Sequence, residues 1–196
     1  MTTFREARLG DFRRALTIRR GFPTQRAVPD APMPVLSLAA LRNNTSPRAF
    51  ASWEDLHDLR LDPARPGDVL IAVEGGTLGE AMVLAEGRFG EFVPSQQVAT
   101  VRIHDPAELD PWYLGAWLAT DVGREQIRRL ARGAGIQRVP VSELMSLMLK
   151  VPALHAQRVI GEKFLAFENA IQGHRAVTDC LERLRDVDLA IAFQGS

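Results

Sequence analysis

The sequence predicts an α+β fold, in which a domain built on a mixed or antiparallel sheet spans residues 1–152 and a long helix spans residues 153–196. Short apolar runs bounded by turn residues, which are typical of strands, cluster in the middle of the chain. A stripe of apolar residues at helical spacing follows near the C-terminus. Of the 196 residues, 46% are hydrophobic and 24% are charged, so the chain can bury a substantial core.

The first part of the chain predicts short extended segments in an irregular setting. Residues 15–19 and 35–38 are the candidate strands. The loop between them is rich in proline, which has no backbone N–H to donate to a strand ladder; it contains Pro23, Pro29, Pro32 and Pro34. We therefore expect loops to dominate this region.

Turn signals mark the clearest strands. The turn sequence Pro66-Gly67-Asp68 precedes an apolar run over residues 69–73, and residues 81–84 provide a second run that predicts a hairpin. Residues 98–103 alternate apolar and polar side chains, as a half-buried strand does. The core of the sheet is therefore expected between residues 69 and 103.

Helix signals come after these strands. Asp110 can accept hydrogen bonds from free backbone N–H groups, and Pro111 fits the first helical position, so a helix is predicted to begin there. A second helix is expected over residues 123–132. Ser142 is expected to cap a short helical stretch, and residues 147–151 then alternate as an edge strand.

The last segment predicts one long amphipathic helix beginning near Leu154. A helix of this length must bury its apolar stripe against something, either its own domain or a partner helix, and both interpretations stay open. The residues of the stripe are spaced by three or four with one gap of six: Ile160, Phe164, Phe167, Ile171, Val177, Leu181 and Leu184.

Composition excludes several classes of protein. The N-terminus lacks a signal peptide and no apolar run reaches about 18 residues, so the expected location is the cytoplasm, without a membrane span. Cys180 is the single cysteine and the four histidines lack the spacing of a metal site, so no metal or cofactor is expected.

Charge alone does not predict a nucleic-acid partner, because 24 basic residues balance 24 acidic ones. The first third is mildly basic, and only Lys150 and Lys163 are lysines. Arginine suits guanine and phosphate contacts, although a GC-rich genome would produce the same bias.

Motifs for catalysis are incomplete. Asp110-Pro111-Trp112-Tyr113 lacks the second proline of the adenine methyltransferase motif, and the glycines of residues 75–79 match neither the phosphate-binding loop nor the dinucleotide fingerprint. No serine lies in a nucleophile elbow. We therefore predict no catalytic residue and a protein that is not an enzyme.

Five motifs in one order resemble the DNA-specificity subunits of type I restriction-modification systems. They cover most of the chain: residues 66–71 with Gly75 and Gly79, Gln97-Val98, Trp112-Tyr113-Leu114, Gly135-Ile136-Gln137 before Leu144, and residues 151–160. The resemblance implies a DNA target-recognition domain followed by a long helix for dimerisation or partner binding.

The family usually carries two recognition domains and two long antiparallel helices, whereas this chain has one of each. The difference implies a half subunit that dimerises and reads a palindromic split target; a truncated or orphaned copy is the alternative. The implied partners are double-stranded DNA, a DNA methyltransferase subunit and a translocase or endonuclease subunit, in a system that acts in phage defence.

The candidate DNA contacts are polar residues in the predicted loops. Arginine pairs with guanine, and asparagine or glutamine pairs with adenine, although each of these segments also suits a purely structural turn. The candidates form four groups: Arg19, Arg20, Gln25 and Arg26; Arg42, Asn43 and Asn44, with Arg48 nearby; Thr77, Gln96 and Gln97; Gln137 and Arg138.

The candidate partner contacts lie on the long helix, where internal packing is the competing interpretation. They are Ile160, Phe164, Phe167, Ile171, Leu181 and Leu184. Two functions therefore compete: a DNA-specificity subunit acting with a methyltransferase, and a scaffold or regulatory protein that keeps the fold without reading DNA.

Overall fold

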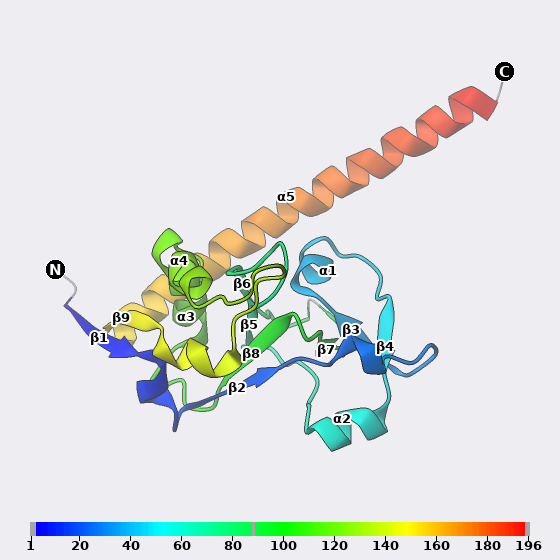
Figure 1. Cartoon of the computed structure of the whole chain (residues 1–196). Coiled ribbons are helices and arrows are strands. Elements are labelled where there is room, and N and C mark those ends of the chain that lie inside the picture. Colours follow the sequence, from blue (N-terminus) through cyan, green and yellow to red (C-terminus); the bar gives the residue numbers. More distant parts are fainter. Residues whose placement is uncertain (1–2, 88, 195–196) are drawn as a thin grey trace.

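The computed structural model describes residues 3–87 and 89–194, which form three small sheets, several short helices and one long C-terminal helix (Figure 1). The strands are β1 (Phe4–Arg8), β2 (Leu16–Arg20), β3 (Met33–Leu36), β4 (Ala49–Ala51), β5 (Val69–Ala72), β6 (Ala81–Val83), β7 (Val93–Pro94), β8 (Val98–Ile103) and β9 (Met148–Pro152). The α-helices are α1 (Leu38–Arg42), α2 (Trp53–Leu59), α3 (Pro111–Leu118), α4 (Asp121–Arg129) and α5 (Leu154–Gln194). Short 3-10 helices are η1 (Leu9–Phe12), η2 (Thr24–Arg26) and η3 (Val141–Ser146).

The central sheet is antiparallel and has the strand order β2-β8-β5-β6. Its register pairs Arg20 with Ala99, Ala72 with Val98, and Ile71 with Ala81. The C-terminal ends of β2 and β5 therefore meet the N-terminal ends of β8 and β6 along one side of the sheet. We call this side, with the loops that leave it, the loop edge.

Helix α3 covers one face of the central sheet. Asp110 caps the helix through a 2.9 Å hydrogen bond from the backbone N–H of Tyr113 to its side chain. A Cβ at Gly115 would lie 2.3 Å from Cγ2 of Val83 in β6, so glycine permits the close approach of helix and strand. Together α3, the central sheet and the first turns of α5 enclose the largest apolar core.

Tyr113 is buried in this core, and its hydroxyl donates to the backbone oxygen of Lys150 in β9. Burial raises the pKa of Tyr113 from 10.0 to about 12, because the phenolate would lose its hydration. A raised pKa in the folded chain means that this group stabilises the fold below pH 10 and that the contribution is lost as the pH rises toward 12.

Tyr113 is the single tyrosine, so absorbance at the phenolate band reports its titration alone. We expect a midpoint near pH 12 for the folded protein and near pH 10 for the same chain in concentrated urea. Equal midpoints in the two states would contradict the burial of this phenol.

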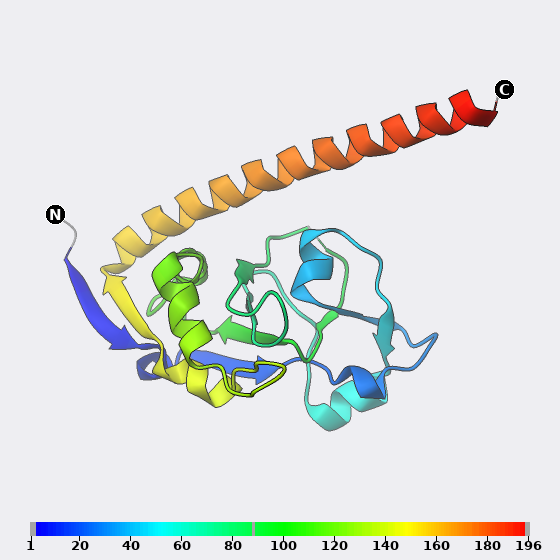
Figure 2. The same ribbon diagram turned by 45° about the horizontal axis from the view of Figure 1, so that its top comes forward.

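The start of α5 is fixed against α3 by a buried glutamine. The side chain of Gln157 accepts a 3.0 Å hydrogen bond from the N–H of Asp110 and donates at 3.1 Å to the oxygen of Pro152. A Cβ at Gly161 would lie 2.8 Å from both Asp110 and Trp112, so this turn of the helix also requires a small residue. Beyond these turns α5 extends clear of the domain (Figures 1 and 2).

The three-stranded sheet has the order β4-β3-β7, with β3 antiparallel to β4 and parallel to β7. It joins the central sheet where the chain leaves β2: the N–H of Gly21 donates to Val98 and that of Phe22 donates to Pro94. A Cβ at Gly21 would lie 2.2 Å from the backbone oxygen of Pro94, so only glycine fits at this junction.

The predicted fold class is confirmed, with mixed and antiparallel sheets followed by a long helix. The apolar runs at 69–73, 81–84 and 98–103 form β5, β6 and β8, and Asp110 caps α3 as expected. Within the described residues no helix is both long enough and apolar enough to cross a membrane.

Several local predictions were wrong. The segment 35–38 is not wholly extended, because Ser37 accepts from the N–H of Ala40 and caps α1. The helix expected at roughly 123–132 is present as α4, but it begins two residues earlier, at Asp121, where Thr120 is the cap, and it ends at Arg129. Ser142 caps nothing, since η3 begins after Pro140 without a side-chain cap.

Candidate nucleic-acid interface

Four loops that are distant in sequence meet at the loop edge. The chain leaving β2 contacts the segment before β8 through a 2.7 Å hydrogen bond from the N–H of Gln96 to Phe22. The segment after β5 pairs with the loop 132–138 through a bridge between Glu74 and Arg138. The sheet register therefore assembles candidates from separate parts of the sequence on one side of the domain.

Glu74 is the centre of this assembly. Its carboxylate is nearly buried, and it accepts a 2.7 Å hydrogen bond from Arg20 and hydrogen bonds of 2.8 and 3.1 Å from Arg138. Arg20 also donates at 2.8 Å to the backbone oxygen of Gln96. One carboxylate thus holds two partly exposed guanidinium groups in place and leaves a net positive charge at the surface.

Arg42 lies farther along the loop edge. Its guanidinium pairs with Glu80 and donates at 3.0 Å to the backbone oxygen of Ala81, which ties the end of α1 to the start of β6. The predicted arginines Arg20, Arg42 and Arg138 are therefore all held by carboxylates. Glu74 and Glu80 were not among the residues predicted from the sequence, because their only local signal is an acidic residue beside a glycine near a strand end.

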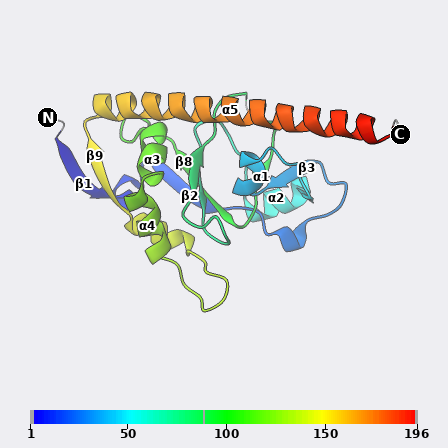
Figure 3. The ribbon, with the colours of Figure 1, turned by 90° about the horizontal axis from the view of Figure 1, so that it is seen from above.

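Most of the neutral candidates lie in three places. Asn43 and Gln97 line a groove of about 360 Å³ beside the loop edge. Gln137 is exposed on the loop 132–138, which projects on the side of the domain away from α5 (Figure 3). Thr77 and Asn44 occupy turns: Thr77 accepts from the N–H of Glu80, and Asn44 follows α1 with a positive φ of 48°.

Gln25 and Arg26 lie apart from the Glu74 assembly. Both are exposed in η2, and Arg26 lies 3.5 Å from Asp55 of α2. The sequence grouped these residues with Arg19 and Arg20 because they are close in the chain. The structure does not bring the four together.

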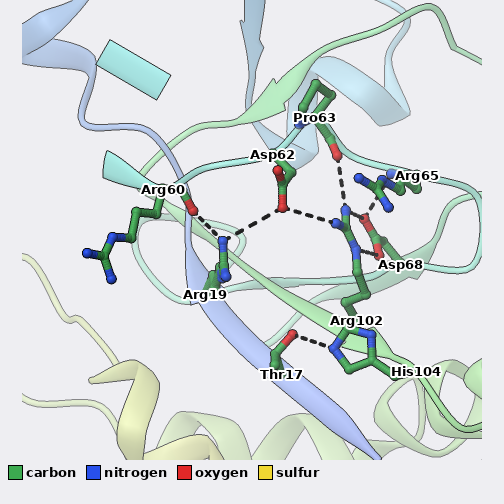
Figure 4. Close-up of polar contacts among 9 residues, drawn as sticks. All are labelled: Thr17, Arg19, Arg60, Asp62, Pro63, Arg65, Asp68, Arg102 and His104. Carbon is green, nitrogen blue, oxygen red and sulfur yellow. Dashed lines mark hydrogen bonds and ion pairs between the residues drawn. The ribbon is translucent and has the colours of Figure 1, made fainter. Parts of the chain in front are cut away.

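Arg19 points to a different partner from that of Arg20, because neighbouring strand residues face opposite sides of a sheet. Figure 4 shows Arg19 and Arg102 directed toward Asp62, at 3.7 and 3.6 Å. Arg102 makes two hydrogen bonds to Asp68, from Nε at 2.8 Å and from Nη2 at 2.7 Å.

The Arg102–Asp68 pair is largely buried, and Asp68 is only 2% exposed. The hydrogen bonds to Asp68 raise the pKa of Arg102, against the opposing effect of its burial. In the sequence, Asp68 is part of a predicted turn and Arg102 is part of a predicted strand, and neither was predicted to form an ion pair. Their role here is to hold the loop after α2 against the central sheet.

The candidate partner residues of α5 also divide into two groups. Ile160 and Phe164 pack against the domain's own apolar core. Beyond them the helix exposes large apolar side chains: Phe167 (68%), Ile171 (44%), Leu181 (61%) and Leu184 (56%). Internal packing therefore accounts for the first two turns of the stripe and leaves the rest of it uncovered in a single chain.

No protein-family model matches this sequence, and no curated protein matches it. Several solved structures are similar in fold. The S subunit of the type I restriction-modification system from M. genitalium superposes with a TM-score of 0.66 at 16% identity, over 94% of this chain and 44% of that one.

Two further structures agree. A chain from the structure that describes complex assembly and conformational transition of the type I R-M system has a TM-score of 0.60 at 22% identity, over 92% of this chain and 43% of that one. The HsdS subunit from Thermoanaerobacter tengcongensis has a TM-score of 0.56 at 22% identity, over 91% and 39% respectively. The resemblance inferred from the five sequence motifs is thus confirmed in the fold, and this chain has the fold of type I restriction-modification S subunits over about two fifths of their length.

Proposed function

We propose that this chain is a non-catalytic DNA-specificity subunit that directs a type I-like adenine methyltransferase or restriction complex to a split target site. In this proposal residues 1–152 form the target-recognition domain and residues 153–196 form the helix that binds partners. The observation that carries the proposal is the loop edge, where arginine and amide side chains from four separate loops meet on a fold like that of S subunits.

The chemistry of the loop edge fits a DNA ligand. Arg20 and Arg138 each donate to Glu74 and retain further N–H groups that can donate to an external acceptor. Because Glu74 fixes these guanidinium groups before any ligand arrives, little side-chain entropy is lost on binding. The projecting loop adds the side-chain amide of Gln137, which can both donate and accept hydrogen bonds.

The exposed stripe of α5 supports a partner role for the helix. A second copy of this chain would bring two recognition domains to a target, and two-fold symmetry of the protein would make that target palindromic. The other proposed partners are double-stranded DNA, a DNA methyltransferase subunit and a translocase or endonuclease subunit. In this proposal the complex acts in the cytoplasm, in phage defence.

The test is to map methylated adenines by long-read sequencing in cells that express a type I methyltransferase subunit from the same genome, with and without this chain. We expect a palindromic split motif that is modified only when the chain is present. Binding of the complex to that motif should exceed its non-specific binding by about a thousandfold or more and should weaken steeply with salt.

Other outcomes discriminate between the proposals. An asymmetric motif would contradict the homodimer and indicate a second, different recognition chain. Absence of any new methylation, together with absence of salt-dependent duplex binding, would contradict the specificity subunit and favour a scaffold.

A further inference from the structure

Most of the polar side chains in the groove beside the loop edge have no partner within the domain. The groove lies between the loop after α1 and the segment that leads into β8, and it has a volume of about 360 Å³. Apolar residues of β3 and α1 form part of its lining, and its polar side chains are those of Thr24, Ser37, Asn43, Thr45, Ser46, Arg48, Ser95 and Gln97. Among the described residues, Ser37 accepts a 3.2 Å hydrogen bond from the N–H of Ala40, and the other seven side chains take part in no hydrogen bond or ion pair.

Three arginines elsewhere on the loop edge, in contrast, are bound by carboxylates of the same chain. Arg20 and Arg138 bind Glu74, and Arg42 binds Glu80. These ion pairs hold the loops together, so the arginines have a structural role even without a ligand. Apart from Ser37, which caps α1, the polar side chains of the groove have no such role among the described residues.

Ser95 indicates that the groove is built for a ligand. The residue is 4% exposed, its Oγ is buried, and this oxygen has no hydrogen-bond partner. A buried unsatisfied hydroxyl destabilises the free protein and is uncommon in native structures. The backbone around it cannot shift to relieve this, because Ser95 donates to Leu36 at 2.8 Å, accepts from Val98 at 2.9 Å and packs directly on Gly21.

The chemistry and shape of the groove select the kind of ligand. Its polar groups are hydroxyls, amides and one guanidinium, set beside apolar residues such as Val35 and Leu36, and no carboxylate of the described residues lines it. Serine, threonine, asparagine, glutamine and arginine are the side chains that donate to phosphate oxygens in DNA complexes. A concave site cannot reach the floor of the major groove, where base edges lie, but it can receive the convex sugar-phosphate backbone.

We infer that this groove binds the sugar-phosphate backbone of the target DNA. Ser95 and Arg48 donate hydrogen bonds to one phosphate, and Asn43 and Gln97 donate to the adjacent phosphates. The inference rests on the proposed function and gives Asn43 and Gln97 a phosphate-binding role in place of the base-reading role that the sequence suggested. Base reading then falls to the projecting loop, where Gln137 and Arg138 are exposed.

The experiment compares single variants of the full chain, in complex with its methyltransferase subunit, on a library of duplexes at several salt concentrations. Ser95→Ala is expected to weaken binding to all sequences by about tenfold, because a hydrogen bond to a charged oxygen is lost. Its thermal stability should be unchanged or higher, since the hydroxyl has no partner in the fold. Arg48→Ala is expected to weaken binding to all sequences. It should also reduce, by about one, the slope of the logarithm of the binding constant against the logarithm of the salt concentration.

Gln137→Ala is the matched variant outside the groove. It should change the preferred base at one position of the target while leaving the salt slope unchanged. A changed base preference for Ser95→Ala or Arg48→Ala, or unchanged affinity for both, would contradict binding of the DNA backbone in this groove. Neither outcome would contradict the proposed function as a specificity subunit. A wild-type complex with no sequence preference at all would instead overturn the proposed function.

Discussion

Replacing Asp68 with asparagine is expected to lower the free energy of unfolding by about 3 kcal/mol, because the guanidinium of Arg102 would be left in a largely buried site without its counter-charge. Asp68 accepts two hydrogen bonds from Arg102 and one of 2.8 Å from the N–H of Arg65. The substitution keeps the size of the side chain and one acceptor, so the loss of charge dominates. Urea denaturation monitored by tryptophan fluorescence gives the change directly.

Asp62→Asn is the matched control for this prediction. Asp62 lies 3.6 Å from the same guanidinium, but its side chain is 54% exposed, so the expected loss is under about 1 kcal/mol. Replacing both members of the buried pair, in Asp68→Asn with Arg102→Met, should recover part of the stability, because no unpaired charge is left. Equal effects of Asp68→Asn and Asp62→Asn would contradict the assignment of Asp68 as the group that holds this loop.

Replacing both Leu181 and Leu184 with glutamate is expected to abolish self-association of the chain. Both side chains are more than half exposed on α5, on the part of the helix that extends clear of the domain. If they are buried between two copies, each new carboxylate would lose its hydration without a counter-charge, which costs several kcal/mol and weakens the dimer by at least about 100-fold. Sedimentation equilibrium over a range of concentrations measures this change.

The apolar stripe of α5 changes face at the gap of six residues between Ile171 and Val177, so the face that forms the dimer can be tested. At about 100° per residue, Val177 lies about 120° around the helix from Ile171, so the distal apolar residues do not continue the face that packs on α3. Ala176→Glu is the control, because it adds a carboxylate to an exposed position on a different face. A dimer that survives the leucine substitutions would contradict this face as the interface, and a monomeric wild-type chain would contradict the homodimer itself.

Elements with strong local signals were predictable from the sequence. Helix α3 has a capping aspartate and a proline at its first position, and β5 and β8 are apolar runs bounded by turn residues. Short elements were not predictable in the same way. The five residues of α1 and the seven of α2 are too few to establish a helical period, and their caps, Ser37 and Ser52, resemble ordinary loop serines.

The sequence indicated which polar residues were candidates for the interface, but it did not indicate which partners those residues bind. Arg20 and Arg138 stood out as polar groups in loops, yet Glu74, which binds both, is separated from them by 54 and 64 positions in the chain. Asp68 and Glu74 read as surface turn residues in the sequence, and the structure buries both. Ser95 carries no local signal that its hydroxyl is enclosed.

The sequence by itself determined the α+β class, the main strands, the starts of α3 and α5, and the resemblance to type I S subunits, because capping, periodicity and motif order act over neighbouring residues. Tertiary structure decided which arginines are held by carboxylates, which polar groups are left free, and how far the stripe of α5 is covered. These properties depend on the register of the central sheet, which brings distant loops to one edge, and on the direction of α5, which carries its distal half away from the domain.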